Sequence, residues 1–383
     1  VGAQTVGSEA LAGGGAARWL GWGRRHGSAL LLGFVAAVVL AAAACGGLTV
    51  GRFQERSGDL AQAPLRSLQL TLVSSYAAND SPAPSWSPDG TRFVYAEQYM
   101  SRIMVFDLGT QGASVVYDAN TAPSTVADLR YNVDSPRFLD DSRILSGPSW
   151  PGALSDTSPW SNSMVTSTTG AAPTPFSPGY HAQVNPVDGR VLLEGSDGLR
   201  LTDSNGVQLE LYPYHCNARW APDGKRFAAI QYDSYCGENG RLVVISEDAT
   251  SELIERNVAQ LCWHPRGLGI GFVRPAGTAY SYSYGYDFGT LWYRELGAEG
   301  AKKLAERARN PVFVPKLEYL VFESPDGLGM SDLQDKRIFR EINISNPAPS
   351  PDGSKLVGVS STYTQGYYYA MMNIVLYELS VGR

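Results

Sequence analysis

The chain has 383 residues and a formal net charge of −6, with 37 acidic and 31 basic side chains. This balance excludes the strongly basic footprint of a nucleic-acid-binding protein. Gly (41 residues) and Pro (23 residues) are abundant, and convincing amphipathic helices are scarce, which favours an all-β protein with many turns.

The N-terminal region has the pattern of an export signal. Residues 1–27 carry three arginines and a single acidic residue, and residues 28–44 then run without a charge. An uncharged segment of this length suits the apolar part of a signal peptide or a short membrane anchor. Because the preceding arginines stay in the cytoplasm, we expect everything after the segment to be exported.

The end of the uncharged segment, Ala42-Ala43-Ala44-Cys45, resembles a bacterial lipoprotein signal, although Ala42 stands where Leu is usual. The resemblance implies that Cys45 is lipidated and becomes the new N-terminus. An uncleaved anchor and ordinary signal cleavage are the alternatives. Residues 46–66 are polar and Gly-rich and indicate a flexible tether. We therefore predict a signal or anchor at 1–45, a tether at 46–66 and one domain at 67–383.

The large domain is built from repeats. The turn sequence Ser87-Pro88-Asp89-Gly90 returns as Ala221–Gly224 and as Ser350–Gly353, and a short apolar strand follows each copy. Pro, Asp and Gly at these positions form the tight turn of a β-hairpin. Weaker copies fill the gaps, and the equivalent positions are Pro88, Asp140, Pro186, Pro222, Pro265, Pro315 and Pro351. Their steps of 52, 46, 36, 43, 50 and 36 residues predict seven units in one closed domain.

The two ends of the repeat array complement each other. Leu68–Val73 alternates apolar and polar residues before the first unit, as a half-buried strand does. The last unit ends with the strand 373–380 and has no room for a fourth strand. We expect the early strand to complete the last unit, because this pairing closes the array and removes an open sheet edge.

The repeats resemble those of TolB-type β-propellers and their WD-like relatives. The resemblance depends on Trp86-Ser87-Pro88-Asp89-Gly90, the basic residue and apolar strand that follow, and the next strand at 102–108. It covers roughly residues 68–380 and implies a single propeller of seven four-stranded blades. TolB proteins also carry an N-terminal α/β domain, which residues 46–66 are too short to supply.

In such a blade the Pro-Asp-Gly turn lies on one face, and the connection from the second to the third strand lies on the other. Several of these connections are rich in Tyr, a residue that is enriched in recognition surfaces. The predicted binding face consists of Tyr99, Tyr232, Tyr235, Tyr280, Tyr282, Tyr284, Tyr286, Tyr363, Tyr367, Tyr368 and Tyr369. The alternative is that these long connections fold over one another and bind nothing.

Two cysteines of the fourth unit should reach the same face. Cys216 precedes the first strand of the unit, and Cys236 lies in its second connection. In an exported protein this placement predicts a Cys216–Cys236 disulfide and leaves Cys262 as a buried free thiol. His215 is adjacent, but no Cys-x-x-Cys spacing supports a zinc site, so neither a metal nor a cofactor is predicted.

Catalytic signatures are missing from the sequence. There are four histidines, and we find no Gly-x-Ser-x-Gly elbow, phosphate loop or dinucleotide fingerprint. We therefore predict a membrane-tethered, extracytoplasmic scaffold in the cell envelope, whose partner is an envelope protein or a polysaccharide. Two alternatives remain: a propeller hydrolase or lyase with catalytic residues along the central channel, and a structural subunit of a larger envelope assembly.

Overall fold

The computed structural model describes residues 65–78, 83–97, 101–121, 133–148, 162–233, 240–276, 288–362 and 371–381. These residues belong to one compact unit, Arg56–Arg383. They form strands throughout, apart from turns, links and one short 3-10 helix, η1 (Leu65–Ser67). Within this described part no helix has the length and hydrophobicity of a bilayer-spanning segment. The predicted signal or anchor, with Cys45, lies outside it.

The strands form five antiparallel sheets of four strands and one of seven. Three of the four-stranded sheets are β2 (Ser85–Trp86), β3 (Arg92–Glu97), β4 (Arg102–Asp107), β5 (Gly112–Asp118); β6 (Val133–Phe138), β7 (Arg143–Pro148), β8 (Asn162–Ser167), β9 (Thr174–Pro178); and β10 (Tyr180–Val184), β11 (Val191–Gly195), β12 (Gly198–Thr202), β13 (Gln208–Pro213). The fourth is β14 (His215–Trp220), β15 (Arg226–Gln231), β16 (Arg241–Ser246), β17 (Ser251–Arg256), and the fifth is β25 (Ser345–Pro349), β26 (Lys355–Thr362), β27 (Met371–Val381), β1 (Leu68–Ala78).

The seven-stranded sheet contains the strands β18 (Gln260–Trp263), β19 (Gly269–Arg274), β20 (Gly289–Glu295), β21 (Lys302–Phe313), β22 (Leu320–Ser324), β23 (Gly327–Ser331) and β24 (Lys336–Phe339). It arises because β21 is twelve residues long. The first part of β21 pairs with β20, and its last part pairs with β22. Two predicted units, those with turns at Pro265 and Pro315, are therefore joined by one continuous strand.

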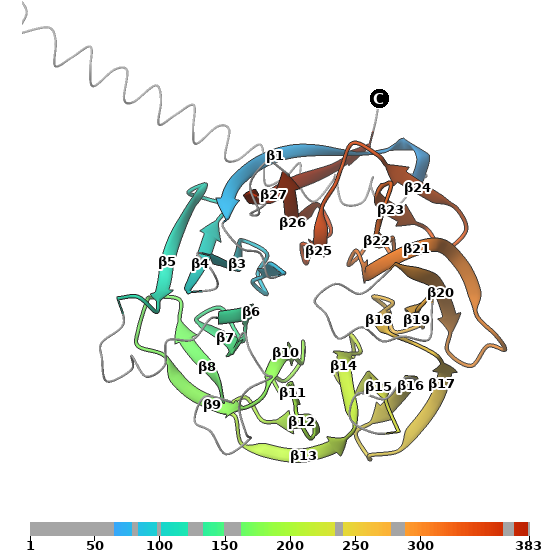
Figure 1. The fold of residues 1–383 in the computed structure, drawn as a ribbon, viewed down its shortest axis with the longest axis horizontal. Coiled ribbons are helices and arrows are strands. Elements are labelled where there is room, and N and C mark those ends of the chain that lie inside the picture. The colour runs from blue at the N-terminus through green and yellow to red at the C-terminus, as the bar shows by residue number, and fades with distance from the viewer. Residues whose placement is uncertain are drawn as a thin grey trace, which may run out of the picture. The chain divides into compact units, whose positions relative to one another are not determined.

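The sheets of this unit stand around a common centre, and the first strand of each sheet lies nearest to it (Figure 1). The prediction of an all-β propeller with four-stranded sheets is thereby confirmed. Short apolar strands form the second and third strands of each sheet, and their side chains fill the space between neighbouring sheets, as in the cluster of Trp86, Phe93 and Phe106 with Val357 and Ile374.

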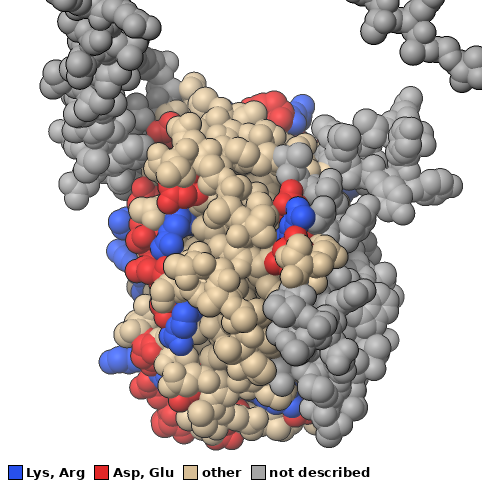
Figure 2. Space-filling view, turned by 90° about the vertical axis from the view of Figure 1, so that its left-hand side faces the viewer, with Lys and Arg blue, Asp and Glu red and all other residues tan. Residues whose placement is uncertain are grey.

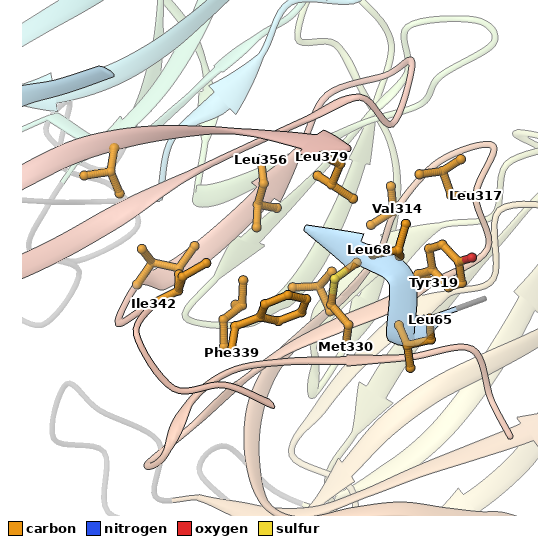
Figure 3. Close-up of a cluster of buried hydrophobic side chains, with 14 residues drawn as sticks. Leu65, Leu68, Val314, Leu317, Tyr319, Met330, Phe339, Ile342, Leu356 and Leu379 are labelled. Carbon is orange, nitrogen blue, oxygen red and sulfur yellow. The ribbon is translucent and has the colours of Figure 1, made fainter. Parts of the chain in front are cut away.

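The early strand closes the array as expected. β1 pairs with β27 in antiparallel register from Leu68 opposite Val381 to Ala78 opposite Met372. Figure 3 shows that Leu65 and Leu68 lie among buried side chains, including Leu379 of the same sheet and Met330 of the neighbouring seven-stranded sheet. Leu68 is fully buried, which stabilises the closed form by about 1.5–3 kcal/mol.

The Pro-Asp-Gly turns close in the predicted way. In the first turn Ser87 Oγ donates to Asp89 at 2.5 Å, Asp89 accepts from the Thr91 N–H at 2.9 Å, and Gly90 has a φ of +70°. In the last turn Ser350 and Asp352 repeat this arrangement. Burial would raise the pKa of Asp352, but hydrogen bonds from Ser350 and Ser354 outweigh it and lower that pKa.

The tryptophans before the first two full turns, Trp86 and Trp220, each join two sheets. The indole Nε1 of Trp220 donates to the carbonyl oxygen of Gln183 in the preceding sheet at 3.1 Å. The guanidinium of Arg190, also from the preceding sheet, lies 5.3 Å from the centroid of the same ring. Arg92 stands in the same relation to Phe138, at 5.5 Å. The basic residue after the turn is thus a contact to the next sheet.

Candidate functional site

Of the predicted tyrosines the described part contains Tyr232, which is 9 % exposed and packs in a core cluster with Leu242, Ile254 and Val258. In the structure its ring supports the sheet. The remaining predicted tyrosines lie outside the described residues: Tyr99, Tyr235, Tyr280, Tyr282, Tyr284, Tyr286, Tyr363, Tyr367, Tyr368 and Tyr369.

The cysteines occupy different surroundings. Cys216 lies in β14 opposite Ile230, and Cys236 lies outside the described residues, so the Cys216–Cys236 disulfide stays a prediction. Cys262 is a free thiol, 6 % exposed, and burial raises its pKa. His215 is buried, and its Nδ1 lies 2.7 Å from the carbonyl oxygen of Pro213. Among the described residues no group of three His, Cys, Asp or Glu side chains could hold a metal ion.

Five of the innermost strands, β6, β10, β14, β21 and β25, share a backbone irregularity that the sequence did not reveal. Each register shift in these strands contains a non-glycine residue with positive φ, and these residues are Ser135 (44°), His181 (48°), Asn217 (50°), Asn310 (48°) and Asn346 (50°). Asn is among the residues that tolerate this conformation best. Gln260 holds the corresponding place in β18, three residues before Trp263, as Asn217 stands three residues before Trp220.

We define the inner polar cluster as His181, Asn217, Gln260, Asn310 and Asn346. Three members bond to one another directly: Gln260 and Asn310 of the seven-stranded sheet, and Asn346 of the sheet that contains β25. Asn310 accepts from Gln260 Nε2 at 3.2 Å, and its own N–H donates to Gln260 Oε1 at 2.6 Å. Asn310 Nδ2 then donates to Asn346 Oδ1 at 3.1 Å. The cluster therefore runs from one innermost strand to the next.

A buried carboxylate supports this part of the cluster. Glu323, at the end of β22, is 4 % exposed. Its Oε1 accepts from Asn310 Nδ2 and from the Asn346 N–H, both at 2.6 Å, and its Oε2 accepts from Arg309 Nε at 2.7 Å. The register shift in β25 removes the Asn346 N–H from the hydrogen-bond ladder of its own sheet. The Glu323 carboxylate accepts from this N–H group instead.

Glu194 has the same role at the end of β11. Its Oε1 accepts from the Asn217 N–H at 2.7 Å, and its Oε2 lies 3.3 Å from His181 Nδ1. Asn217 Nδ2 donates onward to the Ala259 carbonyl oxygen at 2.8 Å, next to Gln260. Hydrogen bonds therefore join His181 to Asn217 through Glu194 and join Gln260, Asn310 and Asn346, and the peptide bond between Ala259 and Gln260 connects the two groups.

The cluster places amide and imidazole groups and two carboxylates near the centre of the sheets. The His181 side chain is 46 % exposed and that of Glu194 15 %, and Asn217, Asn310 and Asn346 are half-buried. Gln260 and Glu323 are buried beneath them. In each of these repeats a polar residue stands three positions before the aromatic or apolar residue that precedes the turn, as Asn217 stands before Trp220. This sequence pattern could have located the cluster, but only after the repeats are aligned with one another.

No protein-family model and no curated protein matches the sequence. Solved structures resemble the fold. A chain of hydrazine synthase from Kuenenia stuttgartiensis has a TM-score of 0.52 and 13 % identity over 73 % of this chain and 93 % of its own. A chain of the mitotic checkpoint complex has a TM-score of 0.55 and 13 % identity over 83 % of this chain and 94 % of its own. Together with the strand arrangement, these two likenesses establish a β-propeller fold.

Proposed function

We propose that the chain is a binding propeller of the cell envelope, which holds a partner protein at the end that bears the connections between second and third strands. β3, β15, β19 and β26 are second strands, so their last residues lie at the same end of the sheets. Eleven of the 21 tyrosines of the chain, the whole predicted face, follow in the connections after these four strands, and one of them, Tyr232, is buried. This concentration is the observation that carries the proposal, because Tyr gives large contact area at low entropic cost.

The opposite end has a different chemistry. Its turns are short and satisfy their own backbone groups, as in Asp140 with Ser142 and Arg143, and in Asp203 with Asn205 and Val207. Lys, Arg, Asp and Glu side chains gather along one side of the described surface (Figure 2). Charged residues other than Arg are depleted in the cores of protein interfaces, so a surface of this kind favours solvent over a partner.

The proposal includes seven blades of the TolB-like kind. The strands β18 to β21 and β21 to β24 each pair in the order of a four-stranded blade. We count them as two blades that share β21. With the five four-stranded sheets this count equals the seven repeats of the sequence.

The proposal also includes the N-terminal tether, with the propeller outside the cytoplasm and Cys45 as the lipid attachment site. Its support is the uncharged segment 28–44 and the small residues before Cys45. The intact mass of the protein extracted from native membranes tests this part. A chain that starts at Cys45 with an added diacyl or triacyl mass supports it, and a chain cleaved elsewhere and recovered in the soluble fraction contradicts it.

The binding proposal is tested with two variants of the full chain. In the first variant four tyrosines are replaced by serine: Tyr280→Ser, Tyr282→Ser, Tyr284→Ser and Tyr286→Ser. The second variant carries Tyr363→Ser, Tyr367→Ser, Tyr368→Ser and Tyr369→Ser. Photo-crosslinking in native membranes, followed by mass spectrometry, measures partner capture. We expect each variant to lose a wild-type crosslinked partner with no change in thermal unfolding.

The matched control carries Val187→Ser and Val207→Ser. Both side chains are more than 60 % exposed, at 68 % and 61 %, and both lie in turns at the other end of the sheets. This control should retain the partner. The proposal is wrong if the tyrosine variants capture the same proteins in wild-type amounts, or if the control loses them equally.

A further inference from the structure

The inner polar cluster offers a ligand a second set of side chains, which are separate in sequence from the tyrosine-bearing connections. We propose that the cluster, together with Glu194, binds a neutral, hydroxyl-rich ligand, namely a saccharide unit. The inference goes beyond the proposed function, because it rests on described residues of the innermost strands and not on any tyrosine.

The members of the cluster differ in exposure in the way a binding site requires. His181, Asn217, Asn310 and Asn346 present partly exposed side chains on the innermost strands, nearest the centre of the sheets (Figure 1). Gln260 and Glu323, which are 5 % and 4 % exposed, both bond to Asn310, and Glu323 also bonds to Asn346. Exposed polar groups held by buried ones are positioned before a ligand arrives, which reduces the entropy cost of binding.

The chemistry of the cluster selects the ligand class. Amide side chains and imidazole both donate and accept hydrogen bonds, and a saccharide hydroxyl does the same. The two carboxylates, Glu194 and Glu323, accept only, and Glu323 already engages Arg309 at 2.7 Å. The guanidinium of Arg309 offsets the charge of Glu323, and the carboxylate of Glu194 disfavours a phosphate, sulfate or carboxylate ligand by repulsion.

The backbone holds the geometry rigid. Positive φ at His181, Asn217, Asn310 and Asn346 directs these residues out of the regular ladder. The carboxylates of Glu194 and Glu323 accept from the N–H groups of Asn217 and Asn346 across the gap between sheets. A displacement of one strand would break these bonds, so the side chains keep fixed positions relative to one another.

Saccharide binding is measured with the full chain on an array of neutral oligosaccharides of glucose, galactose, mannose and N-acetylglucosamine, with uronic-acid oligosaccharides as the anionic comparison. Positive probes are then titrated by calorimetry. We expect at least one neutral oligosaccharide to bind, and the uronic-acid probes to bind more weakly. If no neutral probe binds, or if the uronic acids bind best, the proposal is overturned.

The variants His181→Gly and Asn346→Gly locate the site. Glycine adopts positive φ without strain, so each change removes a side chain and keeps the backbone. Each should weaken binding about tenfold or more, the equivalent of one lost hydrogen-bonding group. The control Gln111→Gly makes the same change at a φ of +53° in the turn between β4 and β5, and should bind as the wild type does.

Two further results bear on the inference. Wild-type affinity in both cluster variants would place the saccharide elsewhere and refute the cluster as its site. Normal saccharide binding by the tyrosine variants described above, with loss of their crosslinked partner, would support two separate sites. This comparison also separates the failure of one proposal from the failure of the other.

Discussion

The indole Nε1 of Trp263 donates a hydrogen bond to the carbonyl oxygen of Arg219, 2.8 Å away in the preceding sheet. Trp86 makes the equivalent bond to Ala348 at 2.8 Å, across the junction between the first and last sheets. A donor on one innermost strand thus reaches an acceptor on the strand before it. The aromatic residue of the repeat fixes the spacing between sheets as well as filling it.

The change Trp263→Phe should lower the free energy of unfolding by about 1–2 kcal/mol, because it leaves the Arg219 carbonyl without this donor. Urea unfolding followed by circular dichroism measures the loss. The matched control is Trp292→Phe, because Trp292 Nε1 is buried without a hydrogen-bond partner in the described part of the chain. If both variants lose equal stability, aromatic packing and not the hydrogen bond explains the role of Trp263.

The variant Asn310→Gly should be destabilised by about 1–3 kcal/mol, because its partners Gln260 and Glu323 are buried and lose their bonds to it. Asn310→Ala should cost about 1 kcal/mol more, since Ala tolerates the φ of +48° less well than Gly. Chemical denaturation compares the two.

Lys316→Gly and Lys316→Ala provide the control, because Lys316 has a φ of +65° in an exposed turn. They should show the Gly–Ala difference without the loss of buried hydrogen bonds. Equal stability of Asn310→Gly and the wild type would mean that the bonds to Gln260 and Glu323 contribute nothing.

Stability should fall as the pH drops below about 6.5 because of His264. Burial lowers the pKa of His264, and Glu318 opposes the shift. The unfolded chain then binds a proton near its ordinary pKa while the folded chain resists it, so protons favour unfolding in this window. His215, whose pKa burial also lowers, adds to the same trend.

The variant His264→Ser tests this, since Ser occupies the same turn position at Ser87 and Ser350. Urea midpoints between about pH 8 and about pH 5 should fall less steeply for His264→Ser than for the wild type. His215→Gln should reduce the remaining slope. Parallel curves for wild type and both variants would contradict the assignment.

Thiol reactivity distinguishes the cysteines. Burial raises the pKa of Cys262, and the thiolate is the reactive species, so iodoacetamide should label Cys262 after denaturation and not before. With a Cys216–Cys236 disulfide, denaturation without reductant should expose no thiol from either of these residues. Labelling of Cys216 under these conditions would refute the disulfide.

The repeats made the fold predictable, and the reason is local. A turn such as Ser87–Gly90 specifies a hairpin through the backbone φ angles that its residues favour and through its side-chain hydrogen bonds. The apolar strand after the turn has a single pairing register that buries its apolar side chains, so its position in the sheet is also fixed. The pairing of β1 with β27 was predictable from the missing fourth strand. The continuous β21 was not, because nothing around Arg309 signals that a strand turns from one sheet into the next.

The inner polar cluster escaped prediction for a different reason. His181, Asn217 and Asn310 are separated by many residues and come together only when the sheets stand around one centre. Their positive φ depends on a register shift, which follows from strand pairing and not from the residues themselves. Glu194 and Glu323 look like ordinary strand ends in the sequence, and their role depends on the N–H group of the following sheet.

The long strand β21 has a mechanical consequence. Within β21 the chain passes from its pairing with β20 to its pairing with β22 without leaving the strand, so this junction has no link residues that could act as a hinge. Residues that absorb a change of angle must lie in links such as Tyr214 between β13 and β14, or 340–344 between β24 and β25. The seam between β1 and β27 is held by hydrogen bonds and side-chain packing without a direct chain connection, so a force that widens the propeller would act first at this seam.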